Sequence, residues 1–288
     1  MGSALGARLR EGGARVLVAL DGRSPRTRRR AHDAGLEDVA TLDALVRGVD
    51  VVFSVVPPGS ALEVAADVLS AAGDARPLFA DLNAIAPATA RAVAVVLAEG
   101  GIETVDGSIS GPPPGASGTT RVYLSGLRAG EIAALPADGA EWIVVGDDVG
   151  MASAVKMCTA SVYKGRVALL AQALRTADAH GVVEHVLADL VGTGLADPAR
   201  VGGTLGKASA KAWRYVPEME EIAATQAAAG LTPELFLAVA RVYEGLAERA
   251  LADAPEDVPG DLPLAVVLAR LSAGGAGRDV AEGPSRTG

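Results

Sequence analysis

Apolar runs of strand length alternate with helix-like segments through the first half of the chain. The runs lie in the segments 14–20 (ARVLVAL), 49–61 (VDVVFSVVPPGSA) and 77–93 (PLFADLNAIAPATARAV), the last two continuing past the strand. Beyond residue 146 apolar residues recur at helical spacing almost throughout. This order predicts an α/β domain over residues 1–146 and an all-helical domain over 147–273. Residues 274–288, rich in Gly, Ser and charge, are expected to be a disordered tail.

The start of the chain predicts an incomplete nucleotide-binding sheet. MGSALGARLREGG has the spacing of a helix that ends at Gly12–Gly13, and the strand at 14–20 follows. A helix followed by a strand is the second part of a βαβ unit, so the first strand should lie before Met1. We expect a Rossmann-type doubly wound sheet that lacks this strand, with Gly2 as the third glycine of a G-x-G-x-x-G turn. A mis-assigned start codon or a trimmed chain would explain the absence.

Residues after the predicted strands are candidates for binding a dinucleotide. Arg23, Ser24 and Arg26 follow the strand at 14–20, where the adenosine ribose binds in such folds, and they favour the 2′-phosphate of NADP. Asp21 would suit NAD, which stays possible, and a solvated basic helix start is the alternative interpretation. Three residues that end the strand at 49–61 are also candidates, namely Val56, Pro57 and Pro58.

Two further segments carry candidate contacts. Asn83 follows a strand and could bind cofactor ribose or carboxamide, or could simply form a turn before a helix that starts near Pro87. A strand is expected to end at Asp106–Gly107, so that Ser108, Ile109, Ser110 and Gly111 form a loop. Glycine backbone and serine hydroxyls could hold a substrate carboxylate there, and an ordinary surface turn is the alternative.

A long helix is predicted from within 146–165 to about Gly181, and it carries Lys156 in an apolar setting. A lysine in a helix is most often a solvated charge, whereas a buried lysine beside a nicotinamide could exchange a proton with an alcohol. Pro217, Gly230 and Pro233 are expected to separate the helices that follow. Cys158 is expected to pack in the core. Six residues of the segment 207–221 could contact substrate from a partner domain, although a solvated amphipathic helix is the favoured interpretation; they are Lys207, Lys211, Trp213, Arg214, Glu218 and Glu221.

Composition narrows the function classes. The net charge of −9 argues against nucleic acid and anionic membrane as partners, and no run reaches the length of a spanning helix. The single cysteine excludes a disulfide framework and suits a cytoplasmic localisation. The three histidines lack metal-ligand spacing, so no metal site is expected.

Several motifs in order give the chain a family likeness. MGSALGARL, FSVVPPGSA, DLNAIAP, DGSISGPPP, KMCTASVYKG and AWRYVPEMEEIA lie within residues 1–248. With them the chain resembles the β-hydroxyacid dehydrogenase superfamily, which includes 6-phosphogluconate and 3-hydroxyisobutyrate dehydrogenases. It is most similar to a branch with a phosphogluconate dehydrogenase-like C-terminal domain and mostly unassigned substrates.

The resemblance implies roles for particular residues. Lys156 matches the general acid/base lysine of the K-x-x-N-N helix, and DGSISG matches the substrate-binding segment. Thr159 and Ala160 replace the two asparagines. Thr159 and Tyr163, on nearly the same helix face as Lys156, could contact substrate instead. Lys164 corresponds to a second lysine of the branch; it is a further candidate for binding substrate, and it could supply a cation that lowers the pKa of Lys156.

The resulting hypothesis is an NAD(P)-dependent oxidoreductase, with NADP favoured, that acts on a small carboxylate-bearing hydroxy acid or its keto form. Related enzymes imply a homodimer formed through the helical domain. Two alternatives stay open: a non-catalytic nucleotide-binding or scaffold protein, and an imine reductase-like activity.

Overall fold

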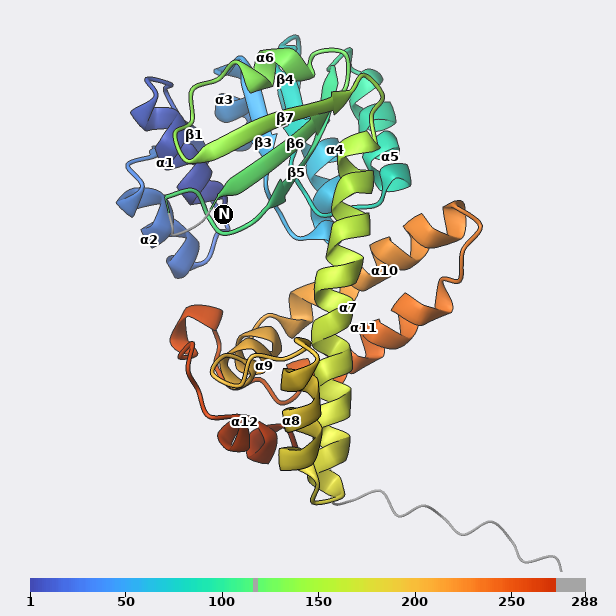
Figure 1. Ribbon diagram of the computed structural model, residues 1–288. Helices are drawn as coiled ribbons and strands as arrows, with labels where there is room; N and C mark the ends of the chain where they lie inside the picture. The colour runs from blue at the N-terminus through green and yellow to red at the C-terminus, as the bar shows by residue number, and fades with distance from the viewer. Residues whose placement is uncertain (116–118, 273–288) are drawn as a thin grey trace, which may run out of the picture. The chain divides into compact units, whose positions relative to one another are not determined.

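The computed structural model describes residues 1–115 and 119–272, and these fall into two compact units (Figure 1). The first unit combines Met1–Val162 with Pro217–Phe236. The second combines Tyr163–Val216 with the described residues from Leu237 to Ser272. The predicted domain boundary after residue 146 lies at the end of a strand, and the predicted tail 274–288 lies outside the described residues.

Helices and strands alternate through the first 146 residues. They are α1 (Gly2–Glu11), β1 (Leu17–Ala19), α2 (Pro25–Asp33), β2 (Glu37–Val39), α3 (Leu42–Arg47), β3 (Val51–Ser54), α4 (Ala61–Ala72), β4 (Leu78–Asp81), α5 (Pro87–Ala98), β5 (Thr104–Ser110), β6 (Thr120–Ser125), α6 (Ala129–Ala133) and β7 (Ala140–Gly146). Helices α1 and α5 begin where the sequence placed them, with α5 starting at Pro87. The expected Rossmann-like α/β fold is confirmed.

The strands form two sheets rather than one. Strands β1 and β2 pair in parallel, and β3-β4-β5-β6-β7 form a second sheet in which only the β5–β6 pairing is antiparallel. In the strand order of a doubly wound fold, the strand expected from the sequence would lie between β1 and β3, where the described sheets are separate. With a partner on one edge only, β1 is three residues long and half-buried instead of buried.

Helices cover both faces of the five-stranded sheet, and its strands alternate between two cores. Phe79 points to the face covered by α4 and α5, while Leu78 and Ala80 point to the face covered by α1 and α6. Burial of these apolar side chains stabilises the sheet and fixes the carboxyl ends of β3, β4 and β5 at a common edge.

The predicted loop at Ser108–Gly111 was wrong, because β5 continues through Ser110. Strand β6 pairs with it from Asp106 as far as Ser110, and Ser108 is fully buried. A run of Gly and Ser looks like a turn in the sequence, but β5 pairs with β6, whose residues lie later in the chain, from Ser110 with Arg121 to Asp106 with Ser125.

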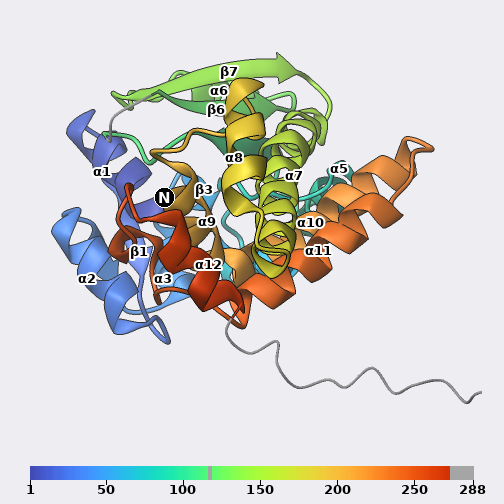
Figure 2. The same ribbon diagram turned by 60° about the horizontal axis from the view of Figure 1, so that its bottom comes forward.

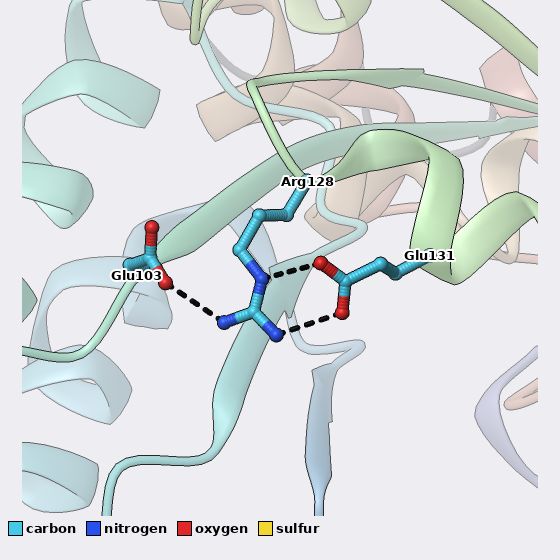
Figure 3. A network of polar contacts seen from close by, with 3 residues as sticks. All are labelled: Glu103, Arg128 and Glu131. Atoms are coloured by element: carbon cyan, nitrogen blue, oxygen red, sulfur yellow. Dashed lines mark hydrogen bonds and ion pairs between the residues drawn. The ribbon is translucent and has the colours of Figure 1, made fainter.

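An exposed ion-pair network joins the start of β5 to α6 (Figure 3). The Arg128 guanidinium donates to both carboxylate oxygens of Glu131, at 2.6 and 2.7 Å, and to Glu103 at 2.8 Å. These hydrogen bonds raise the pKa of Arg128 and lower that of Glu131. The network lies on the surface.

Helices make up the remainder of the described chain: α7 (Met151–Ala179), α8 (Val183–Gly192), α9 (Val201–Ser209), α10 (Ala212–Ala228), α11 (Glu234–Ala247) and α12 (Leu264–Ser272). In the second unit, α8 lies along the C-terminal part of α7, and α9 lies beside α12 (Figures 1 and 2). None of the helices in the described ranges has both the length and the apolar character needed to cross a bilayer.

Two sequence expectations about these helices were wrong. Pro217 lies inside α10 instead of ending a helix, which removes one main-chain hydrogen bond but leaves the helix intact. Cys158 is exposed on α7 rather than packed in the core, since that position of the helix points outward. Gly230 and Pro233 do separate α10 from α11, as expected.

Candidate active site

The N-terminus of α7 is held by a buried carboxylate from β5. Asp106 Oδ2 accepts hydrogen bonds from the main-chain N–H groups of Gly150 and Ser153, at 2.9 and 3.0 Å, and from Ser125 Oγ. Its Oδ1 accepts from Ser153 Oγ at 2.6 Å. A carboxylate is favoured at this position because the first N–H groups of a helix lack partners and carry positive charge. Lys156, one turn further along, is therefore fixed relative to the strand.

The Lys156 amine lies at the end of β5. Its Nζ donates a hydrogen bond to the main-chain oxygen of Ile109 at 2.8 Å, and the residue is half-buried. Burial lowers the pKa of Lys156, whereas the carboxylate of Glu218 raises it. The suggestion that Lys164 supplies a neighbouring cation is not needed, because burial alone accounts for the lowered pKa.

A second buried network joins the ends of β3 and β4. Asn83 Oδ1 accepts from the Val56 N–H at 2.6 Å, and its Nδ2 donates to Ser54 Oγ and to Asp81 Oδ2 at 2.9 and 3.0 Å. Asn83 is thus more than a turn former: it fixes the backbone just before Pro57 and Pro58. Of these prolines, Pro57 is exposed and Pro58 starts a short 3-10 turn.

Burial raises the pKa of Asp81 to about 7, and the nearby Asp106 carboxylate adds to this, although hydrogen bonds from Asn83 oppose it. Burial also raises the pKa of Asp106, against its hydrogen bonds from Ser153, Ser125 and Gly150. Asp81 and Asp106 are paired in register on adjacent strands, so two acidic groups share one buried region.

The predicted cofactor residues occupy two places in the first unit. Gly2, at the start of α1, lies close to β3, since a Cβ on Gly2 would be 3.5 Å from that of Val55. Val55 directly precedes the Val56–Pro58 segment, and the Val56 N–H donates to Asn83. Arg23, Ser24 and Arg26 lie beyond β1 on the exposed start of α2, where Ser24 Oγ caps the helix by accepting from the Thr27 N–H.

The predicted substrate residues are only partly brought together. Ser108, Ile109 and Ser110 share β5 with the Lys156 contact, and Gly111 follows with a positive φ of 103°. However, Ser108 Oγ donates to the main-chain oxygen of Ala152 at 2.9 Å, and Thr159 Oγ1 donates to the Val155 carbonyl within its own helix. Both hydroxyls thus have intramolecular partners.

The last two predicted residues belong to the second unit. Tyr163 is mostly exposed, and Lys164 Nζ lies 4.3 Å from the ring centroid of Tyr215. The substrate roles proposed for Tyr163 and Lys164 stay predictions.

The sequence favoured a solvated helix face over a substrate contact for two glutamates of α10, and the burial of Glu218 contradicts the solvated face. Glu218 is only 6% exposed and acts on Lys156. Glu221 Oε2 accepts from the Ala86 N–H at 2.6 Å and from Thr89 Oγ1 at 2.8 Å, at the start of α5. One feature of the sequence could have indicated the Glu221 contact. Helix α5 begins at Ala86–Pro87 without a capping side chain of its own, so its first N–H groups need an acceptor from elsewhere.

Comparison with known proteins agrees with this geometry. The family model described as the NAD binding domain of 6-phosphogluconate dehydrogenase matches residues 1–135, and a domain of unknown function (DUF1932) matches residues 177–246. A solved conserved protein of unknown function, described as structurally similar to 3-hydroxyacid dehydrogenases, is 31% identical. The similarity covers 85% of this chain and 93% of that one, with a TM-score of 0.62. The chain belongs to the 6-phosphogluconate/3-hydroxyisobutyrate dehydrogenase-like superfamily.

Other similar proteins have lower sequence identity to this chain. An uncharacterized 28.5 kDa protein of Methanothermus fervidus is 28% identical over 172 residues, which cover 60% of this chain and 65% of that protein. Mycobacterium tuberculosis 3-hydroxyisobutyrate dehydrogenase with L-serine shares the fold at 22% identity, with a TM-score of 0.64 over 95% and 96% of the two chains. Streptomyces aurantiacus imine reductase shares it at 23%, with a TM-score of 0.52 over 93% and 95%.

The residues of the first unit fit the nicotinamide cofactor of the superfamily. Exposed guanidinium groups follow β1, and a main-chain segment fixed by Asn83 follows β3, at the edge where ligands bind in such sheets. No cluster of three or more His, Cys, Asp or Glu in residues 1–115 and 119–272 is arranged to hold a metal ion.

Proposed function

We propose that the protein is an NADP-dependent oxidoreductase that interconverts a small carboxylate-bearing hydroxy acid and its keto form, with Lys156 as general acid/base. Membership of the superfamily supports an NAD(P)-dependent oxidoreductase. The observation that carries the finer proposal is the half-buried Lys156 amine, held 2.8 Å from the Ile109 carbonyl at the end of a strand.

The contact with Ile109 suits a group that gains and loses a proton. A neutral amine can donate one N–H to the carbonyl and direct its lone pair elsewhere, whereas the ammonium form keeps the same bond and has two protons left to offer. In alcohol oxidation the amine would take the hydroxyl proton, and in carbonyl reduction the ammonium would return it. The bound nicotinamide supplies or accepts the hydride. Partial burial lowers the pKa of Lys156, which favours the neutral amine needed for oxidation.

NADP is favoured over NAD by the exposed arginines after β1. Replacing Arg23 and Arg26 by Ala removes two donors suited to a 2′-phosphate, so we expect the Kd for NADP to rise about tenfold or more, with little change for NAD. Isothermal titration with both cofactors measures this. An equal loss for NAD and NADP would contradict the assignment of these arginines to the 2′-phosphate.

Lys156→Ala tests the role of the lysine. Removing a general acid/base costs about 10²–10⁴ in turnover. We therefore expect this variant to bind NADP normally but to lose turnover in a screen of hydroxy acids and oxo acids that follows NADPH absorbance. Cys158→Ala, an exposed change on the same helix, is the matched control. Undiminished turnover by Lys156→Ala would remove the lysine from the mechanism.

The same measurements separate the alternatives. A scaffold protein would bind no dinucleotide, so absence of binding for both NADP and NAD would support that class. Thr159 Oγ1 donates a hydrogen bond to the Val155 carbonyl within its own helix, so it already has a partner other than a substrate carboxylate. A substrate that lacks a carboxylate is therefore acceptable, and imines are included in the screen. Turnover of imines but not of oxo acids would favour reductase activity on C=N.

We also propose a homodimer formed through the second unit. Helix α8 has no buried residue although five of its ten positions are Val or Leu, and Tyr163, Leu169 and Trp213 of the same unit are largely exposed. Apolar surface of this kind is typical of protein interfaces. The cytoplasmic localisation stays a prediction from the single cysteine.

A further inference from the structure

Asp81 is a buried acid for which the reaction proposed above has no assigned role. It is the last residue of β4 and is 1% exposed. Its Oδ1 accepts a hydrogen bond from the Asn83 main-chain N–H at 2.8 Å, and its Oδ2 accepts from Asn83 Nδ2 at 3.0 Å. A buried carboxylate is costly unless hydrogen bonds compensate it, so the position of Asn83 is coupled to that of Asp81.

These contacts decide the orientation of the Asn83 amide. The Val56 N–H can only donate, and it donates to Asn83 Oδ1 at 2.6 Å. The ionised Asp81 carboxylate can only accept, so it selects the Nδ2 side of the amide, which also donates to Ser54 Oγ at 2.9 Å. Both N–H bonds of the amide are thus used within the protein, and neither is left for a ligand. Asn83 therefore acts on a bound cofactor through the main chain that it holds.

The main chain that Asn83 holds is the end of β3. Pro57 and Pro58, which follow Val56, carry no N–H, so the Val56 N–H is the donor by which this turn can be held. Because the peptide group is planar, fixing this N–H also fixes the direction of the Val55 carbonyl. The segment follows the carboxyl end of a parallel strand, which is the edge where dinucleotides bind in such sheets.

We propose that Asp81 is a positioning residue for cofactor binding: by selecting the orientation of the Asn83 amide, it fixes the main chain at the end of β3 against which the dinucleotide binds. The connection runs from Asp81 through Asn83 to Val56, by hydrogen bonds of 2.6 to 3.0 Å. This inference rests on the proposed function, and it adds to it the residue that prepares the cofactor site.

Asp81→Asn tests the selection of the amide orientation. The new side chain has one oxygen for the two donors of Asn83, so its N–H₂ group meets Asn83 Nδ2. If the Asn83 amide turns round to avoid this, its own N–H₂ group faces the Val56 N–H, which then loses its acceptor. We expect the Val56 amide to exchange hydrogen about tenfold faster than in the wild type.

Hydrogen exchange followed by mass spectrometry, on peptides that span residues 54–60 of the full chain, measures this without cofactor. A pH of about 8.5 is suitable, because burial raises the pKa of Asp81 to about 7 and the carboxylate form predominates above that value. Asp67→Asn, an exposed change on α4, is the matched control and should leave the exchange unaltered.

A swap of the two side chains restores the match between donors and acceptors. In the double variant Asp81→Asn/Asn83→Asp, the amide at position 81 accepts from the main-chain N–H of residue 83 and donates to the new carboxylate. That carboxylate accepts from the Val56 N–H and from the Ser54 hydroxyl, which can donate as well as accept. Exchange at Val56 should therefore return to within about threefold of the wild-type rate.

The exchange rates decide whether Asp81 acts through Asn83. Unchanged exchange in Asp81→Asn would overturn the inference. Equally fast exchange in the single and the double variant would also overturn it, because a carboxylate that only stabilises the fold would not be replaced by the swap. Circular dichroism establishes that both variants are folded.

Cofactor affinity then tests the functional part. By isothermal titration the Kd for NADP should rise about tenfold in Asp81→Asn, return towards the wild-type value in the double variant and stay unchanged in Asp67→Asn. Faster exchange with an unchanged Kd would place the end of β3 outside the cofactor site, and the inference fails. If the wild type binds neither NADP nor NAD, the proposed function fails, whereas the exchange rates still decide whether Asp81 fixes Val56.

Discussion

At the residue scale, Asp106 links the sheet to the helix that carries Lys156. Asp106→Asn replaces one carboxylate oxygen by an N–H₂ group, and both oxygens now accept hydrogen bonds, so at least one buried donor loses its acceptor. We expect the free energy of unfolding to fall by about 2–3 kcal/mol. Urea unfolding measures this, with the exposed Asp147→Asn as control. An unchanged midpoint in Asp106→Asn would show that the helix start does not depend on this carboxylate.

A second residue-scale prediction concerns Asp81. Its pKa is raised by burial from 3.8 to about 7. Between these two pH values the folded chain binds more protons than the unfolded one, so Asp81 makes stability fall as pH rises from about 4 to 7. Asp81→Asn should remove this part of the slope. Urea unfolding at several pH values compares the two proteins, and identical slopes would contradict the prediction.

The sequence identifies some functional residues, but it does not identify the residues that they contact. Lys156 could be selected by its place in a motif, but its hydrogen bond to Ile109 could not, because that contact joins residues 47 positions apart. Glu221 looked like an ordinary surface glutamate for the same reason: its partners, Ala86 and Thr89, lie at the start of α5, and no local pattern indicates this contact.

At the scale of elements, the Glu221 carboxylate links α10 to the start of α5. Glu221→Ala leaves the Ala86 N–H and the Thr89 hydroxyl without this acceptor, and losing a helix cap costs about 1 kcal/mol. We expect faster hydrogen exchange in the first turn of α5 and in residues 217–228. Glu220→Ala, on an exposed position of the same helix, is the control. Unaltered exchange in both segments would show that α10 is held by packing alone.

Element boundaries were predictable where a residue has strong backbone preferences. Pro87 marked the start of α5, and Gly230 with Pro233 marked the gap between α10 and α11. Prediction failed where tertiary contacts override local preference. Pairing with β6 extends β5 through Ser110, and Pro217 stays helical within α10.

At the scale of the whole molecule, the order of strands and helices was sufficient to predict a Rossmann-like fold followed by helices, because burial of alternating elements allows few architectures. The same pattern could not show that the strands would form two sheets, since pairing depends on which edges meet. Nor does it reveal that a segment of α10 belongs to the first compact unit, because that grouping depends on contacts between residues more than 130 positions apart.

The oligomeric state is also a property of the whole molecule, and α8 is the helix through which we expect two copies to associate. Its five apolar side chains, Val183, Val186, Leu187, Leu190 and Val191, are at best half-buried in the single chain. Covering them in a dimer would gain about 25 cal/mol per Å² of apolar surface removed from water. A Leu187→Glu/Leu190→Glu double variant should therefore keep its helical circular dichroism but sediment as a monomer, whereas the wild type sediments as a dimer. His185→Glu, an exposed change on the same helix, should remain dimeric. If the wild type itself sediments as a monomer at micromolar concentration, this face is not an interface between two copies, and the apolar side chains of α8 need another explanation.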